Sequence, residues 1–142
     1  MPARQKEQLK EINARECWDL LAGEHVGRIG VVVSGRPEIF PVNYSLDASE
    51  SVIIRTGLGT KLEAAVNHHV VFEVDRFDSD LLNGWSVVVH GVAHQTGRVM
   101  EGTRPLETWK DDTPYLLRIA ATSITGRRIH HHPEGAVPAQ DP

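Results

Sequence analysis

The stretch Ile53-Ile54-Arg55-Thr56-Gly57-Leu58-Gly59-Thr60-Lys61 joins an apolar, β-branched segment to a segment with helical spacing through two glycines. The glycines permit a tight backbone path, and Thr60 begins the helical pattern. Lys61 falls in the first helical turn, where a cation opposes the helix dipole. A bound anion would remove that conflict, and Arg55 adds a fork of hydrogen-bond donors. The stretch is therefore a candidate phosphate-binding site, and its spacing alone leaves a solvated turn with a surface lysine equally open.

Other phosphate and catalytic motifs do not fit the chain. The glycine spacing is neither that of a Walker loop nor that of the dinucleotide-binding fingerprint. No serine lies in a Gly-x-Ser-x-Gly elbow, and Cys17 has no nucleophile signature around it. The sequence by itself therefore names no catalytic residue.

The segments before this stretch predict a short helix and an antiparallel meander. Asn13 to Glu16 has the form of a capping box, and Gly23 is a plausible helix stop. Three strands with short turns between them are expected over 26–33, 38–46 and 51–56. Pro41 indicates an edge or a bulge in the second strand.

The segments after it predict a second helix and more strands. We expect a helix over Thr60 to Asn67 and a polar loop over Arg76 to Gly84. Strands are expected over 70–75, over 85–99 with a bend or bulge at Gly91, and as one or two strands over 115–121 and 123–129. An open sheet of this size would leave long edges exposed, so closure is favoured. The expected fold is mainly β, a six- to seven-stranded antiparallel split β-barrel with two or more short helices.

Composition limits the class of protein. The chain has 142 residues, 40% hydrophobic and 24% charged, with a net charge of −4, so we expect one domain over 12–130 with tails over 1–11 and 131–142. A mildly acidic chain is a poor candidate for nucleic-acid or membrane-surface binding. The single cysteine excludes an intrachain disulfide and, with no signal peptide in the first residues, predicts a cytoplasmic location.

Four blocks of sequence, in this order and spacing, resemble the pyridoxamine 5'-phosphate oxidase-like family of FMN-binding split barrels, and its short actinobacterial-type members in particular. The resemblance covers roughly Ile12 to Ile129. The blocks are Glu16-Cys17-Trp18-Asp19-Leu20-Leu21 with Val26-Gly27-Arg28-Ile29, then Pro41-Val42-Asn43-Tyr44, then Arg55-Thr56 through Gly59-Thr60-Lys61, and then Gly84-Trp85-Ser86-Val87.

The resemblance implies a homodimer with two flavin sites at the subunit interface and a flavin-dependent oxidoreductase of unknown substrate. It places the FMN phosphate on Arg55, Thr56, Gly59, Thr60 and Lys61. It places the isoalloxazine ring along Pro41, Val42, Asn43 and Tyr44, partly through backbone groups, and near Trp85 and Ser86, which the other subunit would supply, with Arg127 as a further contact. A small-molecule electron donor or acceptor is the other implied partner.

Several alternatives stay open at this point. Related split barrels use a deazaflavin or haem in place of FMN. The protein as a flavin carrier or sensor that turns over no substrate is a further alternative. His90 and His94 are four residues apart on one strand, about 13 Å, so they do not chelate one ion without a bend. We expect no metal site, and we expect the acidic residues Glu73, Asp75, Asp78 and Asp80 to be a strand end and a solvated loop.

Overall fold

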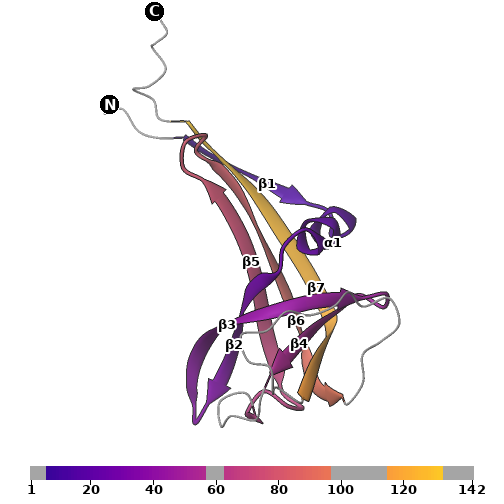
Figure 1. The fold of residues 1–142 in the computed structure, drawn as a ribbon. Helices are drawn as coiled ribbons and strands as arrows, with labels where there is room; N and C mark the ends of the chain where they lie inside the picture. The colour runs from indigo at the N-terminus through magenta and orange to yellow at the C-terminus, as the bar shows by residue number, and fades with distance from the viewer. Residues whose placement is uncertain (1–5, 57–62, 97–114, 133–142) are drawn as a thin grey trace, which may run out of the picture.

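The computed structural model describes residues 6–56, 63–96 and 115–132 (Figure 1). Its elements are, in chain order, β1 (Lys6–Ile12), α1 (Ala14–Ala22), β2 (Val26–Val33), β3 (Arg36–Asp47), β4 (Ser51–Thr56), β5 (His69–Asp78), β6 (Asn83–Thr96) and β7 (Tyr115–His132). In these ranges no helix combines the length and the apolar character needed to cross a membrane.

The strands form one closed antiparallel sheet. Neighbours follow the order β1-β7-β4-β3-β2-β5-β6, and β6 pairs again with β7. That last pairing closes a ring, and β1 is added outside it along the far end of β7 (Figure 1). The expected split barrel is confirmed, because closure removes the edges that an open sheet would leave exposed.

The barrel core draws apolar side chains from every strand and from α1. The largest fully buried side chains include Tyr44, Phe72 and Leu21. The rings of Tyr44 and Phe72 meet edge to face, with centroids 4.9 Å apart, a favourable aromatic geometry. Along each strand, the residues that alternate with these core residues point outward. We call the surface formed by their side chains the outer face.

Helix α1 begins and ends where the sequence predicts. The Asn13 side chain accepts a hydrogen bond from the Glu16 N–H at 2.8 Å, and Gly23 is the C-cap. The Glu16 carboxylate does not complete a capping box, since it pairs with Arg128 on β7. On the buried side, Cys17 packs against Gly126, where an added Cβ would lie 2.6 Å from the Cys17 Sγ. The helix is thereby fixed against β7.

The structure differs from the sequence expectations at both ends of the domain. Residues 1–11 were expected to be a polar tail, but Lys6–Ile12 forms β1 and pairs with 126–132 of β7. The second expected tail, over 131–142, begins within the same pairing. Both segments are rich in polar and charged residues, so backbone hydrogen bonding to the neighbouring strand accounts for much of this pairing, and the buried side chain of Ile12 at the end of β1 adds to it.

The expected polar loop over 76–84 is also wrong, because β5 and β6 continue as a hairpin to Asp78 and Asn83. The Asp78 carboxylate accepts the N–H groups of Asp80 and Leu81 and stabilises the turn. Gly84 makes the hairpin possible, since an added Cβ would overlap the Arg76 carbonyl oxygen.

Two further expectations concern β7 and the second helix. The last one or two strands are a single strand whose register against β6 shifts between His90 and Gly91, which confirms the predicted bulge. The predicted helix over 60–67 starts outside the described residues, and its described end, 63–68, makes tight turns through the Glu63 and Ala65 carbonyls. Only α1 is a complete helix in the described ranges.

Candidate functional site

The four predicted ring contacts on β3 divide between the two faces of the strand. Val42 and Tyr44 are buried in the core, whereas Pro41 is exposed and Asn43 half-buried on the outer face. The Tyr44 hydroxyl donates to the Leu21 carbonyl at 2.5 Å, and its backbone N–H donates to His25. Only Pro41 and Asn43 therefore present their side chains to a ligand outside the barrel.

Pro41 lies where a residue without an N–H is tolerated. It is opposite Arg28 on β2, while β4 pairs with β3 only over 44–47. This part of β3 therefore has a strand neighbour on one side alone, as the sequence predicts for proline.

The predicted phosphate residues begin at the end of β4. Arg55 is exposed and lies opposite Leu116 on β7, and Thr56 is the last residue of the strand. The other members of this group, Gly59, Thr60 and Lys61, lie outside the described residues. Of the predicted phosphate residues, Arg55 is therefore the one whose exposed side chain the structure describes, and it directly precedes the glycine-containing stretch in sequence.

The remaining predicted contacts are neighbours on β6 and β7. Ser86 lies directly opposite Arg127, and Trp85 lies opposite Arg128. Ser86 and Arg127 point to the outer face, whereas Trp85 packs against the core. Beside Trp85, a groove of about 400 Å³ is lined by Arg76, Phe77, Asp78, Ser79, Asn83, Gly84 and Trp85.

The arginines of the described residues fall into two groups. Five have carboxylate partners within 4.0 Å, and they are Arg15, Arg28, Arg76, Arg118 and Arg128. Arg55 and Arg127, together with Arg36, have no such partner among those residues. Within the described part of the chain, no carboxylate competes with an anionic ligand for the two arginines that the sequence assigns to the cofactor, and Asn43 and Ser86 supply neutral polar groups on the same outer face. This donor set fits a flavin nucleotide, which has a phosphate and a ring edged with hydrogen-bonding atoms.

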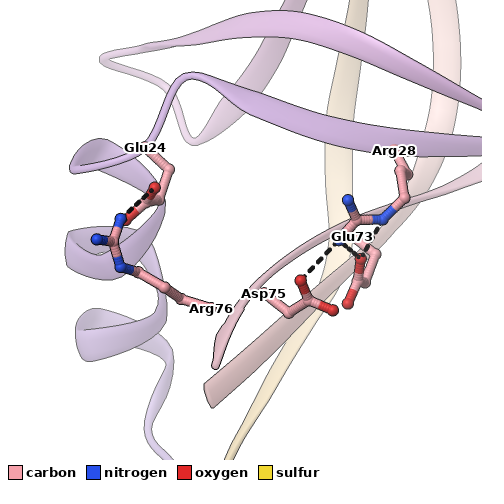
Figure 2. A network of polar contacts seen from close by, with 5 residues as sticks. All are labelled: Glu24, Arg28, Glu73, Asp75 and Arg76. Atoms are coloured by element: carbon pink, nitrogen blue, oxygen red, sulfur yellow. Dashed lines mark hydrogen bonds and ion pairs between the residues drawn. The ribbon is translucent and has the colours of Figure 1, made fainter. Parts of the chain in front are cut away.

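Between these groups lies a charged network that we call the Arg28 cluster, made of Arg28, Glu73 and Asp75 (Figure 2). The Arg28 guanidinium donates to Glu73 Oε1 from Nε at 3.0 Å and from Nη2 at 2.7 Å, and to Asp75 Oδ1 at 2.8 Å. Burial and the neighbouring Asp75 raise the pKa of Glu73, and Arg28 opposes them only in part.

The register places the Arg28 cluster between the two halves of the predicted site. Arg28 lies opposite Pro41 on one side and opposite Glu73 on the other. Asp75 lies opposite Ser86, which in turn lies opposite Arg127. The cluster was missed as a unit at the sequence level, because only the strand register brings residues 28, 73 and 75 together. Arg28, within the Val26–Ile29 block, was the one indication of this cluster in the sequence.

A second network in Figure 2 holds the helix end to the hairpin. Arg76 on β5 donates to both carboxylate oxygens of Glu24, at 3.2 and 3.3 Å. Glu24 follows the C-cap of α1 and precedes β2. The contact fixes the chain entry into β2 and one wall of the groove beside Trp85.

Cys17 does not act as a nucleophile in this arrangement. Its side chain is fully buried between α1 and β7. Burial, with the charge of Glu16, raises the pKa of the thiol, so the reactive thiolate is disfavoured. Cys17 is a core residue, as the sequence favours.

The two halves of the predicted site are far apart within one chain. Arg55 lies opposite Leu116, and Ser86 lies opposite Arg127, on the same strand β7. The eleven positions from Leu116 to Arg127 correspond to ~36 Å of extended strand. Arg55 and the Ser86–Arg127 pair therefore lie along different parts of β7.

Comparison with protein families assigns most of the chain to a known family. Residues 13–128 match the model of the pyridoxamine 5'-phosphate oxidase family. The matched range includes all the elements from α1 to β6 and most of β7.

Individual relatives support the same assignment. The uncharacterized protein Rv0080 of Mycobacterium tuberculosis is 34% identical over 131 residues, with 84% of each chain covered. The solved structure of an FAD-binding protein from Mycobacterium smegmatis is 38% identical, with a TM-score of 0.68, and covers 85% of this chain and 98% of its own. An FAD-binding protein from Mesorhizobium loti is 21% identical, with a TM-score of 0.71 over 87% of this chain and 98% of its own, and shows the shared fold alone.

Proposed function

Because the chain belongs to the pyridoxamine 5'-phosphate oxidase family, we propose that it binds a flavin nucleotide and uses it as an oxidoreductase acting on a small molecule. The observation that supports the proposal is that both arginines assigned to the cofactor by the resemblance, Arg55 and Arg127, have no carboxylate partner among the described residues, a property that they share with Arg36. In a chain where five other arginines are paired, unpaired ones on the outer face are suited to an anionic ligand.

The cofactor phosphate is assigned to Arg55 and to the residues that follow it in sequence, including Lys61. A guanidinium binds a phosphate through two parallel hydrogen bonds, and an ammonium adds a point charge. The isoalloxazine ring is assigned to the outer face at Pro41 and Asn43, with Ser86 and Arg127 reaching it from a second chain. When bound, the flavin supplies hydride or electron transfer, while the protein supplies position and electrostatics.

We propose a homodimer, and the separation of Arg55 from the Ser86–Arg127 pair along β7, ~36 Å of extended strand, supports it. In such a dimer a second copy would bring its Ser86–Arg127 pair to a flavin held by Arg55. Each dimer then has two equivalent sites at its interface, as a two-fold axis requires. The buried free thiol of Cys17 suits a reducing compartment, and we assign the protein to the cytoplasm.

The identity of the flavin is the first thing to measure. FMN and FAD both carry a phosphate on the ribityl chain, so Arg55 and Lys61 suit either, and the 38% identical relative is named for FAD. The protein should purify yellow, and chromatography of the released cofactor separates FMN, FAD and a deazaflavin. A colourless protein that quenches the fluorescence of none of these flavins would refute the proposal. Tight flavin binding with no reductase activity toward quinone or nitro acceptors would leave a flavin carrier.

The phosphate assignment has its own test. Arg55→Ala combined with Lys61→Ala should weaken flavin binding by about two orders of magnitude, since each charge-assisted phosphate contact contributes about 1.5–3 kcal/mol. Arg36→Ala is the matched control, because Arg36 is exposed and has no carboxylate partner in the described residues. Fluorescence titration measures both. Equal affinities of the double variant and the control would place the phosphate elsewhere.

The dimer assignment is tested by mixing two damaged chains. Arg55→Ala damages one group of residues and Arg127→Ala the other. If each flavin uses both groups from different chains, a mixed dimer regains one intact site out of two. Failure of the mixture to regain binding would show that one chain forms the whole site.

A further inference from the structure

Two histidines on neighbouring strands meet on the outer face, away from the proposed flavin residues. His69 begins β5 and lies opposite Val92, while His90 on β6 lies opposite Val71. They are therefore diagonal neighbours, and both are exposed. The His69 Nε2 is 3.2 Å from the His90 Nδ1, and the ring centroids are 5.4 Å apart with a tilt of 37°.

The backbone holds His90 in a defined place. His90 is the last β6 residue before the bulge against β7, and bulges re-aim side chains next to them. Gly91 is required there, because an added Cβ would overlap the Ala120 carbonyl oxygen. The His90 carbonyl accepts a hydrogen bond from the Thr122 hydroxyl at 3.1 Å. The backbone from which the His90 ring projects is therefore fixed before any ligand arrives.

We propose that His69 and His90 chelate one divalent transition-metal ion, with Zn²⁺ as the probe, and that water completes the coordination. In a tetrahedral zinc site with Zn–N bonds of 2.0–2.1 Å, two ligand nitrogens lie about 3.3 Å apart. The observed separation of 3.2 Å matches that edge. Imidazole is a ligand that zinc, copper and nickel favour, and the described residues place no carboxylate against either ring.

The chemistry of binding balances without any further reactant. In the metal-free pair, one ring N–H lies between the two nitrogens as a hydrogen bond. On binding, that proton moves through water to the outer nitrogen of the same ring, and both inner lone pairs bind the metal. Both inner nitrogens then carry no proton, as metal ligation requires.

The remaining histidines of this region have other contacts. His94 Nδ1 is 3.3 Å from the Asn67 side-chain oxygen, and His68 Nδ1 is 2.9 Å from the Val66 carbonyl oxygen. In the described ranges no three His, Cys, Asp or Glu side chains gather to hold an ion, so the site has two protein ligands and open positions. Such a site would clamp the start of β5 to β6 beside the bulge.

The test measures Zn²⁺ binding by titration calorimetry near neutral pH. His130, His131 and His132 are first replaced by Gln, because consecutive histidines bind metals themselves. In that background we expect one Zn²⁺ per chain, and His69→Gln or His90→Gln should each weaken it about tenfold or more. His94→Gln is the matched control on the same face and should leave the affinity unchanged.

Thermal unfolding supplies a second readout. All the substituted side chains are at exposed or strand-end positions, so we expect every variant to fold. The Tm of each variant without metal checks this. Saturating Zn²⁺ should raise the Tm of the background protein and not that of His90→Gln. The proposal is overturned if the background does not bind Zn²⁺, if both single variants bind it as the background does, or if only one histidine matters. Flavin content of the same variants is recorded separately, so the two proposals fail independently.

Discussion

Two arginine–carboxylate networks of this barrel contain the same kinds of charged group, yet the pKa of a carboxyl is lowered in one and raised in the other. On β3 and β7, the Asp47 carboxylate accepts from Arg118 Nε at 3.1 Å, from the Ser49 N–H and hydroxyl, and from the Ser51 N–H. In the Arg28 cluster, one guanidinium serves two carboxylates. In the first network four hydrogen bonds converge on one carboxylate, whereas in the second three hydrogen bonds from one guanidinium are divided between two carboxylates.

The pKa shifts of Asp47 and Glu73 follow the number of hydrogen bonds that each carboxylate accepts. Burial by itself would raise the pKa of Asp47, but hydrogen bonds from Ser49 and Arg118 outweigh burial and lower it. Burial also raises the pKa of Glu73, and the repulsion of Asp75 adds to it. The comparison teaches that the network whose carboxyl pKa is lowered by its hydrogen bonds holds the fold, whereas the network whose carboxyl pKa is raised lies on the face where the flavin contacts are proposed.

The largest expected effect is on stability, at Asp47. Asp47→Ala should lower the free energy of unfolding by about 3 kcal/mol, because it leaves Arg118 without its partner and two backbone N–H groups without an acceptor. The Asp47 side chain is 1% exposed and the Arg118 side chain 25%. Urea denaturation measures the loss. Asp75→Ala, in the more exposed network, should cost less than about 1 kcal/mol, and equal losses would erase the difference between the two networks.

The pH dependence should have opposite signs in the two networks. A folded-state pKa below the ordinary value of 3.8 means that Asp47 contributes stability above pH 3.8, which is lost as the pH falls through the folded pKa. A folded-state pKa above the ordinary value of 4.5 means that the Glu73 contribution is present below pH 4.5 and is lost as the pH rises through the folded pKa.

Glu73→Gln sharpens that distinction. The amide keeps an acceptor for Arg28 and removes the charge, so the variant should gain up to about 1 kcal/mol at neutral pH and nothing below pH 4.5. Asp47→Asn should show the reverse, a loss at neutral pH that shrinks as acid protonates the wild-type carboxyl. Unfolding curves at a series of pH values separate the two. Parallel stability profiles of both variants would contradict the assignment.

The smallest expected effect is at Asp75. Asp75→Asn should change stability by no more than about 0.5 kcal/mol, as an exposed substitution does. It should nevertheless bring the pKa of Glu73 back toward its ordinary value, because the charge next to that carboxyl is gone. Titration of the Glu73 side-chain carbon by NMR measures this. An unmoved Glu73 pKa would make burial its sole cause.

Local signals in the sequence predicted most of the fold. The cap at Asn13 and the stop at Gly23 bound α1 as expected, because cap chemistry involves residues within one turn. The bulge at Gly91 was predicted for the same reason, since a glycine within a strand pattern marks a close backbone approach. The errors fall where local polarity misleads: Lys6–Ile12 and the hairpin at Asp78–Asn83 are polar, yet both pair as strands.

For the candidate site, the sequence supplied the members, and the fold decided which of them face a ligand. Arg55, Ser86 and Arg127 came from a resemblance in order and spacing. Strand parity then separated Asn43, which faces outward, from Tyr44, which is buried. Side chains alternate between the two faces of a strand, so a register shift of one residue moves every side chain to the opposite face. Only the observed strand pairing fixes which residues face outward.

By itself, then, the sequence determined the antiparallel β character, the helix bounds, the bulge glycine and the family to which the chain belongs. Only the tertiary structure decided which residues meet across strands: Arg28 with Glu73 and Asp75, Asp47 with Arg118, and His69 with His90. The physical reason is that turns, caps and bulges depend on neighbours along the chain. Cross-strand contacts depend instead on the register of the whole closed sheet, which no short segment specifies.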